Sequence, residues 1–139
     1  MAKEGTDVTI VHCPEVKFKQ LNILVNNASK QIVYKDLTRI DLGRVGDIFQ
    51  CSIIQMIAMA KDALPYMSRG DSIINTTSVV TLQGLGMVDY AATKGANVGF
   101  TKSLAVQLIP KEIRVNAVVP GAVYTAIQLG TRQGWGLRS

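Results

Sequence analysis

Residues 72–110, SIINTTSVVTLQGLGMVDYAATKGANVGFTKSLAVQLIP, join a short β-branched run to a long segment of helical composition. This run and similar runs at 7–12, 21–25 and 114–119 are together mostly apolar and β-branched, which is typical of strands buried on both faces. The segment 89–109 predicts a helix, and Pro110 directly after it marks its end. This stretch therefore predicts a strand that leads through a loop into a long helix.

The same alternation extends through the rest of the chain. Strand-like runs occur at 7–12, 21–25 and 114–119, and apolar residues recur at helical spacing over 41–67. Strands that alternate with long helices predict an α/β fold with a parallel sheet and right-handed crossovers. With 139 residues, of which 47% are hydrophobic, the chain suits a single domain over 1–139.

Composition excludes several classes of function. The net charge is +5, but the basic residues are scattered and form no run of five, so we expect no nucleic-acid partner. No stretch approaches the roughly 20 apolar residues that span a bilayer. Residues 1–10 contain Lys3, Glu4 and Asp7 and lack the apolar segment of a signal peptide. We therefore expect a soluble, cytoplasmic protein with no membrane association.

Metal and thiol chemistry are also poorly supported. Cys13 and Cys51 form no CxxC pair, which is typical of reduced thiols in an intracellular protein. His12 is the only histidine, so a zinc site or a Ser-His-Asp triad would depend on that one residue. We expect no metal.

Polar or turn-forming residues follow three of the expected strands. These are Asn26-Asn27-Ala28-Ser29, Thr77-Ser78 and Pro120-Gly121. Ligands of open parallel sheets bind beyond the carboxyl ends of the strands, so the clusters predict a pocket there. The alternative is that they are ordinary strand-ending turns.

The sequence Tyr90-Ala-Ala-Thr-Lys94 favours the pocket. Residues four apart share a helix face, so the Lys94 ammonium would lie beside the Tyr90 phenol and lower its pKa. Such a phenol could exchange a proton with a substrate oxygen that Ser78 holds by a hydrogen bond. Taken alone, a Tyr and a Lys at this spacing are usually an amphipathic surface pair. With Ser78 before them, they suit interconversion of a carbonyl and an alcohol, with hydride from a cofactor.

Four segments in this order resemble the short-chain dehydrogenase/reductase family, most closely its glucose/ribitol-type members. They are LVNNA at 24–28, IINTTS at 73–78, YAATK at 90–94 and IRVNAVVPG at 113–121. The resemblance runs from about Leu21 to about Gln128. It implies a Rossmann-type fold and an oxidoreductase that uses NAD or NADP on a small carbonyl or alcohol substrate.

The resemblance also implies roles for individual residues. Tyr90 would be the general acid/base, Lys94 would lower the Tyr90 pKa and hold the nicotinamide ribose, and Ser78 would orient the substrate. Residues expected at the cofactor are Asn26 and Ala28 on the adenosine and ribose side, Asn27 as a support for the central strand, and Pro120, Gly121, Val123 and Thr125 at the nicotinamide and pyrophosphate. The two long helices, about 44–67 and 89–109, would join copies into dimers or tetramers.

The sequence departs from the family pattern in four ways. It contains no TGxxxGxG-type turn, which brings backbone to the pyrophosphate at a helix N-terminus. Residues 13–20 are too few for a crossover, and the chain stops near Ser139, so we expect a partial, truncated domain with about four strands. Ser52 occupies the position of the family's relay asparagine. Twelve positions separate Ser78 from Tyr90, one fewer than is common in the family.

Two readings therefore remain open. The chain is either an NAD(P)-dependent oxidoreductase or a catalytically inactive truncated fragment, which acts as an interaction subunit or has no function. No carboxylate directly follows the strand at 7–12 to bind a ribose 2′-hydroxyl, which slightly favours NADP over NAD.

Overall fold

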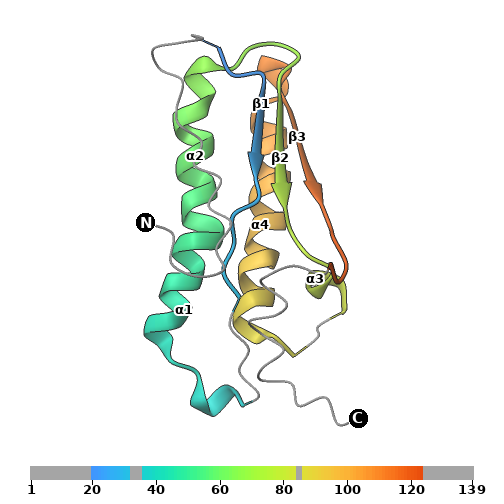
Figure 1. The fold of residues 1–139 in the computed structure, drawn as a ribbon. Helices are drawn as coiled ribbons and strands as arrows, with labels where there is room; N and C mark the ends of the chain where they lie inside the picture. The colour runs from blue at the N-terminus through green and yellow to red at the C-terminus, as the bar shows by residue number, and fades with distance from the viewer. Residues whose placement is uncertain (1–19, 32–35, 84–85, 124–139) are drawn as a thin grey trace.

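A three-stranded parallel sheet forms the centre of the fold (Figure 1). The computed structural model describes residues 20–31, 36–83 and 86–123. The strands are β1 (Ile23–Asn26), β2 (Ser72–Thr76) and β3 (Arg114–Val118), paired in the order β1-β2-β3. The predicted parallel α/β architecture is therefore confirmed. The expected strand at 7–12 lies outside the described residues, as does any sheet contact it makes.

The crossover from β1 to β2 is one long helical segment. It comprises α1 (Leu42–Phe49), a π-helical turn (Gln50–Ile54), α2 (Gln55–Ala63) and a 3-10 turn (Leu64–Tyr66). Asp41 caps its start, because its Oδ1 accepts a 2.9 Å hydrogen bond from the Gly43 N–H. A further 3-10 turn (Leu37–Arg39) precedes it. The helix expected over 41–67 is thus confirmed, except that nothing in the apolar spacing predicts its π-helical turn.

The crossover from β2 to β3 contains the second long helix. A single short helix, α3 (Val80–Gln83), precedes α4 (Val88–Gln107), and a 3-10 turn (Ile109–Lys111) follows. Glu112 then takes a left-handed backbone conformation, with φ of 51°, and the chain enters β3. This confirms the helix expected over 89–109.

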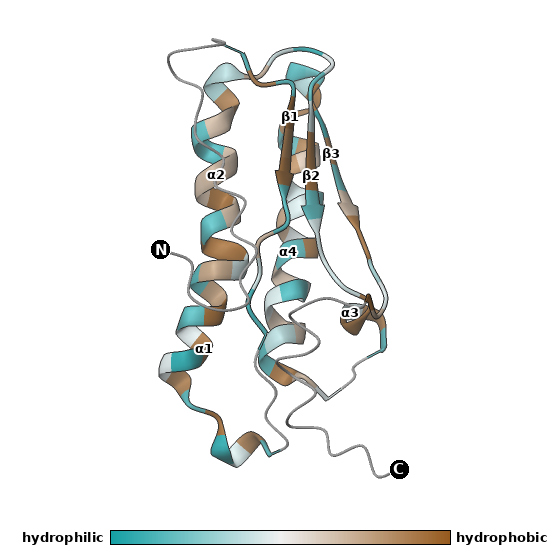
Figure 2. Cartoon of the chain, in the orientation of Figure 1, coloured by the Kyte–Doolittle hydropathy of each residue, from teal (hydrophilic) through white to brown (hydrophobic). Residues whose placement is uncertain are grey.

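The hydrophobic core lies between the sheet and helices α2 and α4. Inward-facing strand residues Leu24, Ile73 and Val115 pack with Ala60 and Ala63 of α2, Leu104 of α4 and the neighbouring Met67, Leu108 and Ile113. Figure 2 shows the apolar residues of β1 and of the amino-terminal part of β2 over this layer. Because β1, β2 and β3 run parallel, their carboxyl ends meet at one edge of the sheet (Figure 1).

The other face of the sheet is largely uncovered by the described residues. Alternate residues of β1, Ile23 and Val25, are 58% and 47% exposed, and Val118 of β3 is exposed as well. The expectation that the strands are buried on both faces is therefore wrong for β1 and β3 in this part of the chain. The reason is that α2 and α4 both pack on the same face (Figure 1).

Candidate active site

The carboxyl edge of the sheet brings Ser78, Tyr90 and Lys94 together. Ser78 follows β2, and Tyr90 and Lys94 lie one turn apart near the start of α4. The side chains of Ser78 and of Ser29, which follows β1, lie near enough to the Tyr90 hydroxyl to influence its pKa. The shorter spacing between Ser78 and Tyr90 therefore still allows the two hydroxyls to meet.

Burial and hydrogen bonding act in opposite directions on the pKa of Tyr90. Burial has the larger effect and raises the pKa above 10.0, because it disfavours the charged phenolate. The hydrogen bonds with Ser78 and Ser29 lower it, since hydroxyl donors stabilise a phenolate. The expected lowering of the Tyr90 pKa by Lys94 is therefore wrong for this structure.

The Lys94 ammonium is buried and lies over the Tyr90 ring. Its side chain is 1% exposed, and Nζ donates a 2.9 Å hydrogen bond to the carbonyl oxygen of Thr76. Nζ also lies 5.5 Å from the centroid of the Tyr90 ring, on the face rather than at the hydroxyl. Burial lowers the pKa of Lys94 from 10.5 to about 8.

Two further hydrogen bonds fix the start of α4 against the end of β2, and a third lies within α4. Thr77 Oγ1 donates to the Lys94 carbonyl oxygen at 3.1 Å, and Thr93 Oγ1 donates to the Tyr90 carbonyl oxygen at 2.8 Å. Asn97 Nδ2 donates to the Thr76 carbonyl oxygen at 3.2 Å, beside the Lys94 ammonium. The geometry of Tyr90 and Lys94 is therefore set by the backbone and not by their side chains alone.

A buried network of side-chain amides and hydroxyls lies beneath the site, and it was not predicted from the sequence. Asn26 Nδ2 donates to Asn75 Oδ1 at 2.8 Å, and Asn75 Nδ2 donates to Thr101 Oγ1 at 2.9 Å. Thr101 Oγ1 in turn donates to the Asn97 carbonyl oxygen at 2.8 Å. The available signal was an asparagine in an apolar strand and two polar residues four apart on the inner face of α4.

The residues expected at the cofactor fall into two groups at this edge. Asn26 is buried, and its amide joins β1 to β2, whereas Asn27 is exposed; the supporting role expected of Asn27 belongs to Asn26. Ala28 is half-buried beside them.

The second group follows β3. The Val79 N–H donates to the Pro120 carbonyl oxygen at 3.0 Å, so Pro120 lies next to the segment that carries Ser78. Gly121 and Val123 are exposed, and a Cβ built on Gly121 would meet no atom within 4 Å. Thr125 lies outside the described residues.

Ser52 contacts Ser29, a residue for which the sequence predicted no role. It is fully buried in the π-helical turn, and its Oγ lies 3.1 Å from Ser29 Oγ, in a hydrogen bond that either hydroxyl could donate. Ser29, to which Ser52 bonds, is also one of the two serines that influence the Tyr90 pKa.

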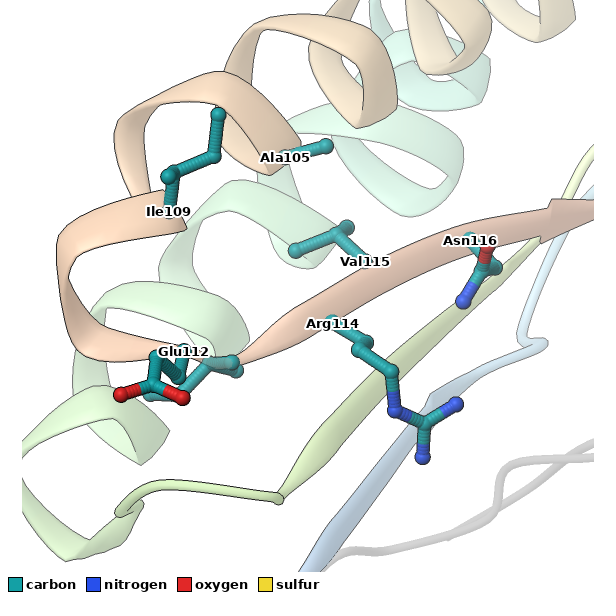
Figure 3. Close-up of a pocket in the computed structure, with 7 residues that line it drawn as sticks. Ala105, Ile109, Glu112, Arg114, Val115 and Asn116 are labelled. Carbon is teal, nitrogen blue, oxygen red and sulfur yellow. The ribbon is translucent and has the colours of Figure 1, made fainter.

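The hollow in Figure 3 lies at the opposite end of the sheet. It has a volume of about 640 Å³ and is lined by Ala105, Ile109, Glu112, Ile113, Arg114, Val115 and Asn116. These residues come from the end of α4, the beginning of β3 and the connection between them, away from Tyr90 and Lys94. Among the described residues no cluster of His, Cys, Asp and Glu could hold a metal, and no helix could cross a membrane.

The fold and site define a Rossmann-type α/β domain with a Ser–Tyr–Lys constellation at the carboxyl edge of a parallel sheet. The sequence model of the family described as short chain dehydrogenase matches residues 3–134. The chain therefore belongs to the short-chain dehydrogenase family, as the sequence resemblance implied.

Two curated relatives illustrate the similarity. The chain is 44% identical over 111 residues to "Glucose and ribitol dehydrogenase" of Daucus carota, and 42% identical over 111 residues to "NADPH-dependent aldehyde reductase 1, chloroplastic" of Arabidopsis thaliana. Each match covers 79% of this chain and 38% of the relative. The chain thus spans less than two-fifths of the length of these relatives.

Two solved structures share the fold. One is a short chain dehydrogenase from Burkholderia cenocepacia in complex with NADP, with a TM-score of 0.75 and 32% identity over 78% of this chain and 44% of that one. The other is a 3-ketoacyl-(acyl-carrier-protein) reductase from Brucella melitensis complexed with NADH, with a TM-score of 0.77 and 26% identity over 84% of this chain and 51% of that one.

Proposed function

We propose that this chain carries the proton-transfer half of an NAD(P)-dependent oxidoreductase that interconverts a carbonyl and an alcohol. The observation that carries this proposal is the meeting of Tyr90 with Ser78 while the Lys94 ammonium lies at its ring. Membership of the short-chain dehydrogenase family supports it, as do relatives whose names state oxidoreduction.

In this proposal Ser78 donates a hydrogen bond to the substrate carbonyl oxygen and polarises it. NAD or NADP, held by Lys94 and the residues that follow β3, would supply or accept the hydride at the carbonyl carbon. As negative charge develops on the oxygen, the Tyr90 hydroxyl gives it a proton and becomes a phenolate. In the oxidation direction the phenolate removes the alcohol proton. The Lys94 ammonium is largely charged at neutral pH because its pKa is about 8, and its role in this proposal is to hold the nicotinamide ribose.

The residues present fit the nicotinamide side of such a cofactor. Lys94 has three N–H donors, of which one is donated to Thr76, so others can reach a ribose hydroxyl. Open space beside Gly121 allows backbone to approach a ligand closely. We therefore assign Tyr90, Lys94, Pro120, Gly121, Val123 and Thr125 to the nicotinamide ribose and pyrophosphate.

On the adenosine side we assign Asn26, Asn27 and Ala28. Because the Asn26 amide is already bound to Asn75, Asn26 would contribute backbone atoms and Asn27 and Ala28 their exposed surface. NADP is favoured over NAD, in keeping with a relative named as NADPH-dependent and a solved structure that contains NADP.

A second function, an inactive subunit that binds another protein chain, is favoured by exposed apolar surface. Ile54 and Ile57 are exposed on the first long helix, 44–67, and Leu42 is exposed just before it. Val106 is exposed on the second long helix, 89–109. These residues would join copies of the chain.

Titration of the purified chain with NADPH and NADH, followed by nucleotide fluorescence, separates the two functions. Saturable binding that Lys94→Ala weakens, and carbonyl-dependent oxidation of NADPH that Tyr90→Phe abolishes, are the expected results. Lys102→Ala, an exposed lysine of the same helix, is the matched control. A folded chain that binds neither nucleotide would contradict the enzymatic proposal and leave the interaction subunit.

A further inference from the structure

The carbonyl oxygen of Thr76, at the end of β2, accepts two side-chain hydrogen bonds. Lys94 Nζ donates one at 2.9 Å and Asn97 Nδ2 donates the other at 3.2 Å. The pairing of β2 with β1 ends one residue earlier, at Asn75, so Thr76 lies beyond that ladder. A carbonyl oxygen has two lone pairs, which these two donors can occupy. The position of the Lys94 ammonium is thereby tied to that of the Asn97 amide.

The neighbours of Asn97 fix the direction of its amide. A carbonyl oxygen only accepts, so the amide atom that faces Thr76 must be the nitrogen. The same nitrogen lies 2.9 Å from Met56 Sδ of α2, which accepts from it. The amide oxygen lies 3.3 Å from Thr101 Oγ1, one turn further along α4, which donates to it. Each polar atom of the Asn97 side chain therefore has a partner that suits this orientation.

Lys94 depends on the Thr76 carbonyl for its direction. In the part of the chain that the structure describes, this carbonyl is the acceptor of the one hydrogen bond from Nζ, and no carboxylate forms a salt bridge with it. The proposed function requires the remaining N–H donors of Lys94 to hold the nicotinamide ribose. A shift of the Thr76 carbonyl would turn these donors away from the ribose.

We propose that Asn97 is a positioning residue, whose amide holds the Thr76 carbonyl so that the Lys94 ammonium points at the nicotinamide ribose. The consequence for nucleotide binding rests on the proposed function, whereas the shared acceptor does not. Asn97 is 0% exposed, so it acts through Thr76 and Lys94 and not on a ligand.

Asn97→Leu is a clean substitution for testing this role. Leucine keeps the branched shape of asparagine but has no N–H donor. Thr76 would still accept from Lys94, and Thr101 Oγ1 would keep its 2.8 Å hydrogen bond to the backbone carbonyl oxygen of residue 97. No polar group that these bonds join is therefore left without a partner. Asn97→Ala makes the same change without the bulk of leucine.

A double-mutant cycle shows whether Asn97 acts through Lys94. We expect Asn97→Leu to raise the Kd for NADPH about three- to tenfold, which is part of what a hydrogen bond from a charged group contributes. In a Lys94→Met chain the same substitution should change the Kd by less than about twofold, because the group that it positions is gone. Nucleotide fluorescence measures all four chains.

Leu104→Val is the control for a general loss of stability. Leu104 lies on the same helix, in the hydrophobic core, and makes no polar contact with Thr76. This variant should leave the Kd for NADPH unchanged. Urea denaturation shows that the Asn97 variants and the control are folded under the conditions of binding.

The Lys94 ammonium can also be observed without nucleotide. In a chain labelled with nitrogen-15 lysine, Lys94→Met identifies the Lys94 Nζ signal, and a pH titration of that signal reports the pKa. The N–H dipole of Asn97 points at the same oxygen as the ammonium and disfavours its charge. Asn97→Leu should therefore raise the pKa of Lys94 above about 8, and Leu104→Val should not.

Two results would overturn the proposal. One is an equal rise in Kd for Asn97→Leu with and without Lys94, because Asn97 would then act independently of the ammonium. The other is a Lys94 titration that neither Asn97→Leu nor Asn97→Ala changes. A chain that binds no nucleotide contradicts the proposed function, and a raised Lys94 pKa in such a chain would still support the role of Asn97 in holding Lys94.

Discussion

Lys94 Nζ donates a 2.9 Å hydrogen bond to the carbonyl oxygen of Thr76, the last residue of β2. The ammonium is thus held at the carboxyl edge by backbone, and none of the described carboxylates forms a salt bridge with it. A buried cation with a carbonyl as its acceptor is costly to desolvate, which is why the pKa of Lys94 falls to about 8. Folding therefore fixes the position of Lys94 before any ligand binds.

The burial of Lys94 predicts that the chain becomes more stable as pH rises above 8. The pKa of Lys94 is about 8 in the folded state and 10.5 without burial, so between these values the unfolded chain binds the extra proton. The free energy of unfolding should rise by about 2 kcal/mol from about pH 7.5 to about pH 9.5. Urea denaturation at several pH values measures this.

Two variants show whether Lys94 is the cause. Lys94→Met should abolish the rise, whereas Lys102→Met, at an exposed position of α4, should keep it. Above about pH 10 the raised pKa of Tyr90 acts in the opposite direction, because the unfolded chain then releases its tyrosine proton first. A rise that persists in Lys94→Met would contradict the assignment.

The amide network predicts that substitution of Asn75 lowers the free energy of unfolding unusually strongly. Asn75 is fully buried and bonds with both Asn26 and Thr101, so Asn75→Ala leaves two buried polar groups without this partner. We expect a loss of about 2–4 kcal/mol in the free energy of unfolding, measured in urea. Asn116→Ala, at an exposed position of β3, should change it by less than about 0.5 kcal/mol. Equal losses in the two variants would show that the network contributes little.

Much of the fold could be predicted because its signals are local. Apolar spacing marks the helices around Ile48, Met56 and Leu104, and β-branched runs mark the strands around Leu24 and Ile73. The one-sided burial of β1 could not be predicted, because an apolar run does not say which faces other elements cover. The outward residues Ile23 and Val25 are as apolar as Leu24, yet only Leu24 meets the helices.

The candidate site was predicted in its members but not in its energetics. The order of Ser78, Tyr90 and Lys94 in the sequence was enough to predict that they lie close together. The direction of the Tyr90 pKa shift was not, because it depends on burial and on where the Lys94 Nζ points. Ser29 had no assigned role and Ser52 only one carried from the family, since their contact arises between segments 23 residues apart.

The backbone conformation of Glu112 predicts that Glu112→Gly stabilises the chain. Its φ of 51° is a left-handed conformation, which costs a residue with a Cβ roughly 1 kcal/mol or more and which glycine adopts freely. Its carboxylate forms a 2.9 Å ion pair with Arg69, but both side chains are largely exposed, so this pair contributes little. Glu112→Gly should therefore raise the free energy of unfolding by about 0.5–1 kcal/mol.

Glu112→Ala separates the backbone effect from the ion pair at the same position. Alanine also removes the carboxylate but keeps a Cβ, so the strain remains and stability should stay level or fall slightly. Thermal or urea unfolding of both variants makes the comparison. If alanine stabilises the chain as much as glycine does, the backbone conformation is not the cause.

The proposed role of Ser78 predicts that Ser78→Ala selectively lowers turnover in a chain that reduces carbonyls. In the proposed mechanism its hydroxyl acts on the developing charge of the substrate oxygen, so Ser78→Ala should lower kcat on the order of 10²-fold. The free energy of unfolding should change much less, because Ser78 is half-buried. Nucleotide affinity should also stay nearly unchanged, which distinguishes this variant from Lys94→Ala. Ser78→Thr keeps the hydroxyl and should recover part of the rate. A Ser78→Ala chain with unchanged kcat would show that Tyr90 works without this donor, and would leave Ser78 as only a neighbour that helps to set the Tyr90 pKa.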